Sequence, residues 1–333
     1  MSTPTLCDYL ALLRACFTAY QAVDPEGSRR GPRYTYSQVS LVLFFSVMLL
    51  RRTCGAKAQR RWLMAHPEER ALFGLEKVPS RWTLSRRWKK LSPTIQGFVD
   101  WLGEWAEDLE EDFRGTDLFE DKSLFKALGP IWHQKDRQAG RIPEGLRNLD
   151  TEATWSKSEY HGWVYGYAGH WTTTQAAFPR SVVVETASIS ESEVIDRKAP
   201  ALWETKPHTV TGDNAYCNLH RVRIWAQQGI VLVTPALKTS TDSSEGGPYK
   251  AFIAQPENAA LLKRRKTATE PFFDLMAKLI GAGDQQKQLP VKGLAKVQTC
   301  LTLGTMLAQL AMIVNSIWRM PLHNISHMMA VFT

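Results

Sequence analysis

Cysteine is scarce in this sequence, and its spacing excludes several classes of protein. The 333-residue chain has five cysteines, an odd number, scattered and without a Cys-x-x-Cys pair. This pattern argues against a disulfide framework and a zinc ribbon and is typical of a reducing cytoplasm. The N-terminus lacks the basic-then-apolar pattern of a secretory signal. The chain also lacks internal repeats and a phosphate-cradling glycine loop.

Long uninterrupted apolar runs are missing as well. The most apolar stretch, residues 301–318, carries two threonines, a glutamine, an asparagine and a serine. We therefore predict that it forms a buried helix rather than a membrane span, and we expect no membrane partner. A hydrophobic content of 44% and a charged content of 22% are those of an ordinary globular protein.

Acidic residues are absent between Glu76 and Asp100. Residues 25–100 hold 15 Lys or Arg against 5 Asp or Glu, whereas residues 104–121 hold 9 acids against one arginine. The basic charge behind the formal net charge of +8 is thus concentrated in the N-terminal third. This distribution favours a nucleic-acid-binding face there. A pair of solvated surface helices is the alternative.

Residues 80–91 of this basic region predict a short amphipathic helix. Leu84, Trp88 and Leu91 recur at spacings of four and three, which places them on one helical face. The other faces carry the cations Arg81, Arg86, Arg87, Lys89 and Lys90. An apolar seam with a cationic outer face suits the recognition element of a helix-turn-helix. A solvated amphipathic helix is the alternative, and residues 51–61 are the next candidate for DNA recognition.

After residue 112 the pattern becomes strand-like. Short β-branched or aromatic segments bounded by breakers predict strands at 113–121, 162–171, 181–187, 208–213 and 229–235. Helix-length segments separate the last three, and Ser190 with Glu193 forms a capping box that opens a helix over 191–202. Residues 239–248 read as a loop, and residues 256–280 and 291–318 as helices. The order β-β-β-α-β-α-β predicts an α/β fold with a mixed sheet and flanking helices.

Two carboxylates fall at the ends of predicted strands, Asp121 on the first and Asp213 on the fourth. If these strands are neighbours, the acids face each other where open sheets place their active crevice. The helix after the last strand could deliver Glu270. Adjacent carboxylates repel unless a cation neutralises them, and oxygen ligands suit Mg²⁺ or Mn²⁺. Two such ions ~4 Å apart can serve phosphodiester chemistry. For any single acid, a capping or surface carboxylate is the alternative.

These segments, taken in order, resemble a DDE-type bacterial insertion-sequence transposase with an RNase H-like catalytic domain, over roughly residues 75–320. "VPSRWTLSRRWKKL" resembles the helix-turn-helix entry of that family. "EDKSLFKA" resembles its first-aspartate strand, with Ser123 in the hydroxyl position, and "WSKSEYHGWVYGYAGH" its second-strand region. "TGDNAYCN" resembles the second-aspartate motif and "KRRKTATEPFFDLMAKL" the glutamate helix. The apolar run that follows is similar to the closing helix.

The resemblance implies a transposase that binds terminal inverted repeats as a dimer, cleaves the element ends and joins the freed 3′-OH to target DNA. It carries metal-ligand roles to Asp121, Asp213 and Glu270, with two Mg²⁺ ions for which Mn²⁺ can substitute. It also carries the role of the basic residue four before the glutamate to Lys266, which we expect to contact DNA. The implied domains are a helical DNA-binding domain (1–110), an RNase H-like domain (111–320) and a tail (321–333), in a cytoplasmic, nucleoid-associated protein.

Pro271 departs from the family pattern. The family's glutamate lies within a continuous helix, but proline disfavours helical geometry at the residue before it. Glu270 could instead stand at the N-cap of a helix that begins at Pro271. The position seven after the glutamate holds Ala277, with Lys278 one place late. Pro271 favours an alternative function, a catalytically impaired DNA-binding repressor of transposition. An RNase H-like DNA nuclease without strand transfer is a third interpretation.

Histidines and tryptophans suggest further contacts. His323 and His327, four apart, could share a helix face and bind metal, although no third ligand is nearby in sequence. His133 and His170 are either close to DNA or the metal edge, or structural. The tryptophans Trp155, Trp163 and Trp171 either stack on a frayed terminal base or pack in the core.

Overall fold

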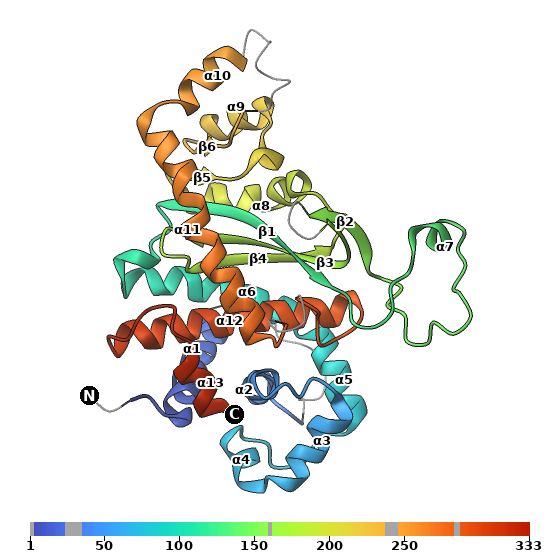
Figure 1. Cartoon of the computed structure of the whole chain (residues 1–333). Helices are drawn as coiled ribbons and strands as arrows, with labels where there is room; N and C mark the ends of the chain where they lie inside the picture. The colour runs from blue at the N-terminus through green and yellow to red at the C-terminus, as the bar shows by residue number, and fades with distance from the viewer. Residues whose placement is uncertain (1–2, 24–34, 159–161, 237–245, 283–286) are drawn as a thin grey trace. The chain divides into compact units, whose positions relative to one another are not determined.

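The computed structural model describes residues 3–23, 35–158, 162–236, 246–282 and 287–333 (Figure 1). The chain divides into two compact units. Unit 1 comprises Met1–Leu102, Lys126–Ala153 and Leu275–Thr333, and unit 2 comprises Gly103–Phe125 and Thr154–Asp274. This division differs from the predicted boundaries at residues 110 and 320, because the C-terminal helices pack against the N-terminal ones.

Unit 1 is helical in its described part. Two helices form its core, α2 (Gln38–Leu50) and α12 (Leu294–Ile317). Every residue of α2 from Ser40 onward is buried, as expected of a helix that is apolar all round. The other helices that lie wholly in this unit are α1 (Leu6–Val23), α3 (Ala56–Ala65), α4 (Pro67–Leu72), α5 (Arg81–Lys90), α7 (Gln134–Gln138) and α13 (Ser326–Phe332). α6 (Ser92–Trp105) runs from unit 1 into unit 2 and is followed by two short 3₁₀ turns over the acidic residues.

α12 is long and apolar enough to cross a membrane by composition, and 89% of its most apolar window is buried within the described residues. Its polar side chains find partners inside the unit. The Gln309 amide donates to the Val99 carbonyl at 2.9 Å, and the Thr299 hydroxyl donates to the Trp88 carbonyl at 2.7 Å. The burial of these satisfied polar groups explains why polar residues interrupt the apolar run. The prediction of a buried helix is confirmed.

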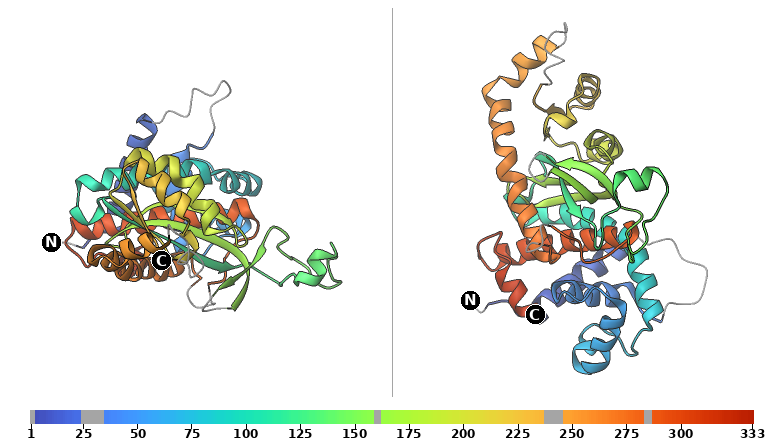
Figure 2. Two further views of the ribbon diagram at one scale, coloured as in Figure 1. Left: turned by 90° about the horizontal axis from the view of Figure 1, so that it is seen from above. Right: turned by 45° about the vertical axis from the view of Figure 1, so that its right-hand side comes forward.

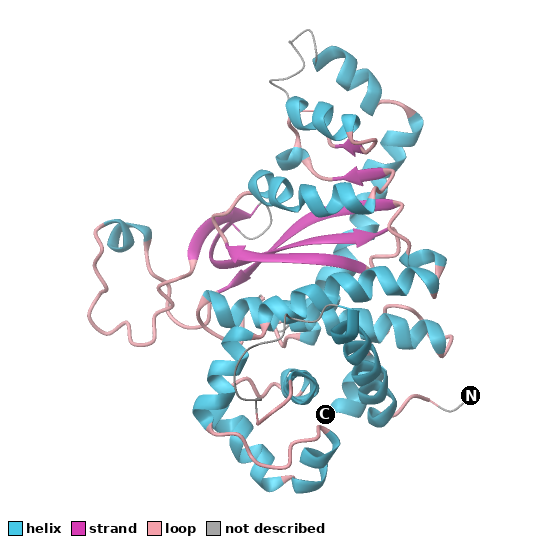
Figure 3. Cartoon of the chain, turned by 180° about the vertical axis from the view of Figure 1, so that it is seen from behind, coloured by secondary structure: helices cyan, strands magenta, loops and turns pink. Residues whose placement is uncertain are grey.

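Unit 2 is built on a mixed sheet (Figure 3). Its strands are β1 (Asp117–Lys126), β2 (Thr154–Ser158), β3 (Gly162–Thr174), β4 (Pro179–Thr186), β5 (Thr209–Thr211) and β6 (Val231–Val233). The order is β2-β3-β1-β5-β6, with β4 also paired to β3. β3 is antiparallel to β2 and β4, whereas β5 is parallel to β1 and β6. The predicted α/β class with a mixed sheet is confirmed.

All five predicted strands are present, and the short elements β2 and α7 are among those that were not predicted. β2 is five residues long and pairs with the start of β3, so its extended state depends on a partner in the sheet. α7 is equally short and has no buried residue, so it leaves no apolar periodicity in the sequence. The predicted loop at 239–248 lies outside the described residues up to 245, and from Gly246 the chain forms α10 (Gly246–Ile253).

Helices cover both faces of this sheet (Figure 1, Figure 2). On one face, α8 (Glu191–Thr205) and α9 (Leu219–Gln227) bury Ile195 and Trp225 against Leu118 of β1 and its neighbours. On the other face, the part of α11 (Pro256–Leu279) that belongs to unit 2 packs Phe272 and Phe273 on the ring of Trp171 in β3. The two faces of β1 therefore point into different environments.

Candidate metal centre and nucleic-acid interface

Asp121 lies on β1, and Asp213 follows the neighbouring parallel strand β5 of unit 2. In the register of β1 and β5, Phe119 is opposite Thr211. Extending this register by two residues brings Asp121 opposite Asp213, which follows β5 after Gly212. Burial is the main cause of a raised pKa of Asp121, and the charge of Asp213 adds to it, as expected for neighbouring carboxylates.

The predicted position of Asp121 at a strand end is wrong. β1 runs from Asp117 to Lys126, so Asp121 lies in its middle. The charged pair Asp121-Lys122 looks like a strand terminus in the sequence, but Ser123 and Phe125 continue the alternation of buried side chains.

The Asp121 carboxylate is held by three donors. Its Oδ1 accepts from the Lys122 backbone N–H at 2.8 Å. Its Oδ2 accepts from the Arg265 guanidinium at 2.7 Å and from the Thr269 hydroxyl at 3.0 Å, both on α11. Burial raises the pKa of Asp121 to about 6, and the positive charge of Arg265 opposes that rise. A buried carboxylate that is hard to ionise favours a cation beside it.

Asp213 is fixed by the turn that follows β5. Its Oδ1 accepts from the Ala215 backbone N–H at 2.8 Å and so caps the 3₁₀ turn Asn214–Tyr216. Position 212 requires glycine, because a Cβ there would lie 2.7 Å from the ring of Tyr216. Asp213 therefore caps a turn, the role that the sequence offered as the alternative to a metal ligand, and it also lies beside Asp121.

Glu270 lies inside a helix, and the prediction that it could stand at an N-cap is wrong. α11 runs from Pro256 to Leu279 without a break at Pro271. Packing of Phe272 and Phe273 on Trp171 opposes the local preference of proline for ending a helix. The Glu270 side chain is exposed, and the contacts of α11 to Asp121 come from Arg265 and Thr269.

The acids that the structure brings together are thus Asp121 and Asp213. Glu270 follows Thr269, the last residue of α11 that contacts Asp121. Within the described residues, no group of three His, Cys, Asp or Glu side chains is placed to hold a metal ion. The pair alone fits a hard divalent cation, since both ligands are carboxylates and one is buried enough to have a raised pKa.

Sequence reasoning missed Arg265 and Thr269. Their spacing of four puts both on one face of α11, and that face contacts Asp121. Lys266 was chosen instead because of its distance from Glu270 in sequence, and the structure leaves Lys266 exposed. The available signal was the i, i+4 pair of polar residues next to the buried Ala268 and Phe272.

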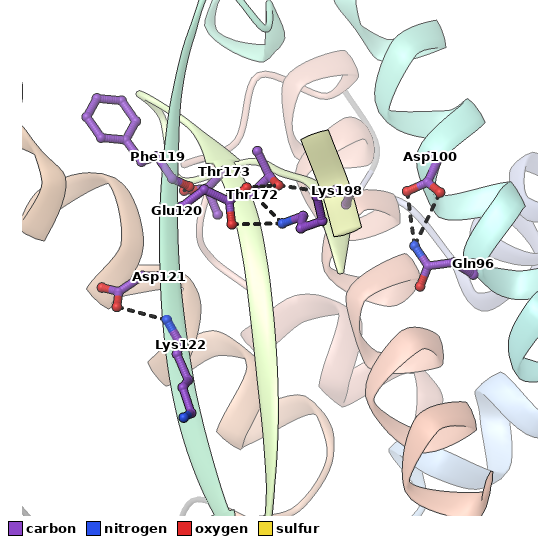
Figure 4. Close-up of polar contacts among 10 residues, drawn as sticks. Gln96, Asp100, Phe119, Glu120, Asp121, Lys122, Thr172, Thr173 and Lys198 are labelled. Atoms are coloured by element: carbon purple, nitrogen blue, oxygen red, sulfur yellow. Dashed lines mark hydrogen bonds and ion pairs between the residues drawn. The ribbon is translucent and has the colours of Figure 1, made fainter. Parts of the chain in front are cut away.

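A second charged pair lies on the opposite side of β1 (Figure 4). Both carboxylate oxygens of Glu120 accept from the Lys198 ammonium of α8 at 2.8 Å, and the Thr172 hydroxyl also donates to Glu120. The side chains of Glu120 and Lys198 are 1% and 6% exposed. Successive strand residues point to opposite faces, so Glu120 enters the α8 layer while Asp121 meets α11.

His170 is a structural histidine in this fold. Its side chain is fully buried in β3. Burial, followed by the charges of Lys122, Lys198 and Arg197, lowers its pKa to about 3, so it is neutral at physiological pH. The other predicted metal pair is wrong, because α13 begins at Ser326 and His323 precedes it, and His327 contacts the Pro4 carbonyl at 2.6 Å. His133 is exposed.

The tryptophans divide by exposure. Trp171 is fully buried against α11, so the suggestion that it stacks on a DNA base is wrong. Trp163 is exposed and contacts the half-buried Trp155 edge to face. Only these two of the three remain on an accessible surface.

Helix α5 has the predicted amphipathic arrangement. Ser80 caps it by accepting from the Thr83 N–H at 3.1 Å, and Leu84, Trp88 and Leu91 are buried. Its exposed cations are Arg81, Arg86, Lys89 and Lys90, and Arg87 is partly buried. Trp82, which was not predicted as a functional residue, is 76% exposed, with the Arg81 guanidinium 5.4 Å from its ring centre.

The alternative basic stretch at 51–61 divides into two groups. The Arg51 guanidinium contacts Glu69 at 3.0 Å and the Phe332 carbonyl at 2.6 Å, and Arg52 donates to the Leu279 carbonyl at 2.6 Å. These arginines therefore hold unit 1 together. The exposed cations of this stretch that lie on α3 are Lys57, Arg60 and Arg61, and α3 packs against α5.

Comparison of the chain with protein-family models, with curated proteins and with solved structures found no match.

Proposed function

We propose that this chain is a DNA transposase of the DDE type, which binds terminal inverted repeats, cleaves at the element ends and joins the freed 3′-OH to target DNA. The observation that carries the proposal is the pairing of β1 with β5, which sets Asp121 opposite Asp213 when the register is extended. Two carboxylates at that point of a mixed sheet fit a centre for divalent cations.

The arrangement of unit 2 supports an RNase H-like fold. With the short β2 set aside, its elements follow the order β1-β3-β4-α8-β5-α9-β6, which is the predicted β-β-β-α-β-α-β. The parallel β5 and β6 are joined through α9, as in a crossover unit. The unbroken α11 weakens the reason that Pro271 gave for a catalytically impaired repressor.

The chemistry requires the chain to orient a phosphodiester and the oxygen that attacks it. Asp121, Asp213 and Glu270 would hold Mg²⁺, or Mn²⁺ in its place, and the bound cations would supply Lewis acidity. Asp121 is oriented by the Lys122 N–H and the Thr269 hydroxyl, and Asp213 by the Ala215 N–H. These fixed orientations reduce the reorganisation that the reaction needs.

We assign recognition of the element ends to α5. Its cations Arg81, Arg86, Lys89 and Lys90 are exposed, and Leu84 and Trp88 seat it in unit 1. The partners are double-stranded DNA at terminal repeats and target, with a homodimer that synapses two ends in the cytoplasm. Lys266, exposed on α11, remains a proposed DNA contact.

A cleavage assay tests this function against both alternatives. Purified chain is incubated with supercoiled plasmid that carries the DNA flanking its gene, in Mg²⁺ or Mn²⁺, and the products are mapped. A transposase gives breaks at the repeat ends and joined products. Bound ends without any nick would support the repressor, and nicks without joined products would support the nuclease.

The contacts of α5 with the DNA backbone can be measured separately. We expect the double variant Lys89→Ala/Lys90→Ala to weaken binding to repeat and scrambled duplexes alike, since phosphate contacts carry no sequence information. The slope of log affinity against log salt should fall by about 0.9 for each lost phosphate contact, or ~1.8 for both. The measurement is duplex affinity across a salt series.

The matched control is Lys135→Ala/Lys206→Ala, which removes the same two charges from exposed positions outside α5. It should keep the wild-type slope. An unchanged slope in Lys89→Ala/Lys90→Ala would show that these two lysines do not contact the backbone, and recognition would then be sought at Lys57, Arg60 and Arg61.

A further inference from the structure

The contact between Arg265 and Asp121 is an ion pair largely removed from water. The Arg265 Nη1 lies 2.7 Å from the Asp121 Oδ2, and the two side chains are 21% and 17% exposed. Of the three donors to Asp121, only Arg265 carries a full charge; the Lys122 N–H and the Thr269 hydroxyl are neutral. Arg265 therefore supplies most of the charge compensation for this carboxylate.

A divalent cation that binds Oδ2 of Asp121 competes with Arg265, because this oxygen has two lone pairs and already accepts from two donors. Mg²⁺ binds carboxylate oxygens at about 2.0–2.1 Å. The Oδ2 of Asp121 already accepts from Arg265 and Thr269, and its Oδ1 accepts from the strand backbone. A cation bound to Oδ2 would lie beside the guanidinium, and partial burial would leave their repulsion poorly screened.

We propose that Arg265 is a positioning residue. Its guanidinium pairs with the Asp121 carboxylate while no metal is bound, and it moves away from Asp121 when the metal binds. This inference rests on the proposed role of Asp121 as a metal ligand. The released guanidinium has a second partner in a DNA phosphate, which arginine binds through paired hydrogen bonds. It would join the exposed Arg264 and Lys266 of α11.

Metal binding and DNA binding are then coupled through one side chain. A phosphate that captures Arg265 leaves Asp121 free for the cation, and a cation on Asp121 frees Arg265 for the phosphate. Such coupling is reciprocal by thermodynamic necessity. The centre would thus fill most readily when substrate is present.

The test measures Mn²⁺ binding to the 333-residue chain without DNA, with electron paramagnetic resonance reporting the free Mn²⁺. We expect Arg265→Gln to bind Mn²⁺ about 5- to 10-fold more tightly than wild type, within the range of typical coupling effects, because no cation has to be displaced. Lys263→Gln removes the same charge from an exposed position of α11 and should stay within about twofold of wild type.

A second readout does not depend on activity. In EDTA, Arg265→Gln should have a lower Tm than Lys263→Gln, and Mn²⁺ should raise its Tm more than that of wild type. Arg265→Met, which keeps much of the stem, serves as a second charge-removing variant if the glutamine variant does not fold. If Arg265→Gln and Arg265→Met both bind Mn²⁺ no more tightly than Lys263→Gln does, the proposal is overturned.

The outcomes separate this inference from the transposase function. One outcome is that Arg265→Gln binds Mn²⁺ more tightly than wild type, that Arg265→Gln/Asp121→Asn loses this gain, and that wild type cleaves no DNA. This outcome would support the inference and contradict the proposed function. DNA cleavage by wild type with no gain in affinity in Arg265→Gln would do the reverse. Mn²⁺ binding that is independent of Asp121 in every variant would overturn the inference and the proposed metal centre together.

Discussion

Asp121→Asn and Asp213→Asn are each expected to lose cleavage of the element ends by about 10³-fold or more, a loss like that from removing a key electrostatic group in other enzymes. Asparagine keeps the shape of the side chain but removes the negative charge and one oxygen ligand. Repeat DNA should bind these variants at least as tightly as wild type, since neither aspartate is a proposed DNA contact. The measurements are product formation on plasmid ends and affinity for the repeat duplex.

Two further variants of α11 sharpen this prediction. Glu270→Gln should behave like the aspartate variants if Glu270 is the third ligand. Asp274→Asn, an exposed acid four residues further along the same helix, should cleave at nearly the wild-type rate. Wild-type cleavage by Asp121→Asn or Asp213→Asn would remove the basis of the proposed function.

Lys198→Met is expected to destabilise the protein by about 3–5 kcal/mol. Glu120 is 1% exposed and both of its oxygens are held by the Lys198 ammonium, so removing the lysine leaves a buried carboxylate without its counter-charge. The Thr172 hydroxyl remains as a neutral donor, which does not replace the charge. The free energy of unfolding from urea titration, followed by tryptophan fluorescence, measures the effect.

The adjacent residue in α8 provides the control for this second prediction. Arg197 pairs with Glu185 and Glu193, but its side chain is 45% exposed. Arg197→Met should therefore cost less than about 1 kcal/mol. Lys198→Met/Glu120→Gln should recover part of the lost stability, because the uncompensated charge is removed. If Lys198→Met costs no more than Arg197→Met, the buried pair contributes nothing to the fold.

Features that depend on residues close in the chain could be predicted from the sequence. The apolar run at 301–318 predicted the buried helix α12, because a helix that is apolar nearly all round has to be buried on all sides. The four-and-three spacing of Leu84, Trp88 and Leu91 predicted the buried side of α5. The Ser190 hydroxyl accepts from the Glu193 N–H at 3.1 Å, as the capping pattern at the start of α8 predicted.

The candidate centre was predicted only in part, because its geometry depends on residues that are far apart in the chain. The residue types and strand order of Asp121 and Asp213 were readable, because a β-branched or aromatic run bounded by breakers is a local signal. The register that sets the two acids side by side belongs to the pairing of β1 with β5, and the exact length of β1 depended on that sheet. Local preference also gave the wrong alternative at Pro271, where packing on Trp171 keeps α11 continuous.

The sequence by itself determined five of the strands, the helices α5, α8, α11 and α12, the basic face of α5 and the two acids Asp121 and Asp213 as candidates. Only the tertiary structure decided which charges meet. Arg265 reaches Asp121 across 144 residues, and Lys198 reaches Glu120 across 78. Periodicity and capping act within a few residues, whereas an ion pair between distant segments forms only after the sheet and its helices have packed. The alternation of β1 points Glu120 and Asp121, adjacent in the chain, to opposite faces (Figure 4), and packing gives one a structural partner and places the other in the candidate centre.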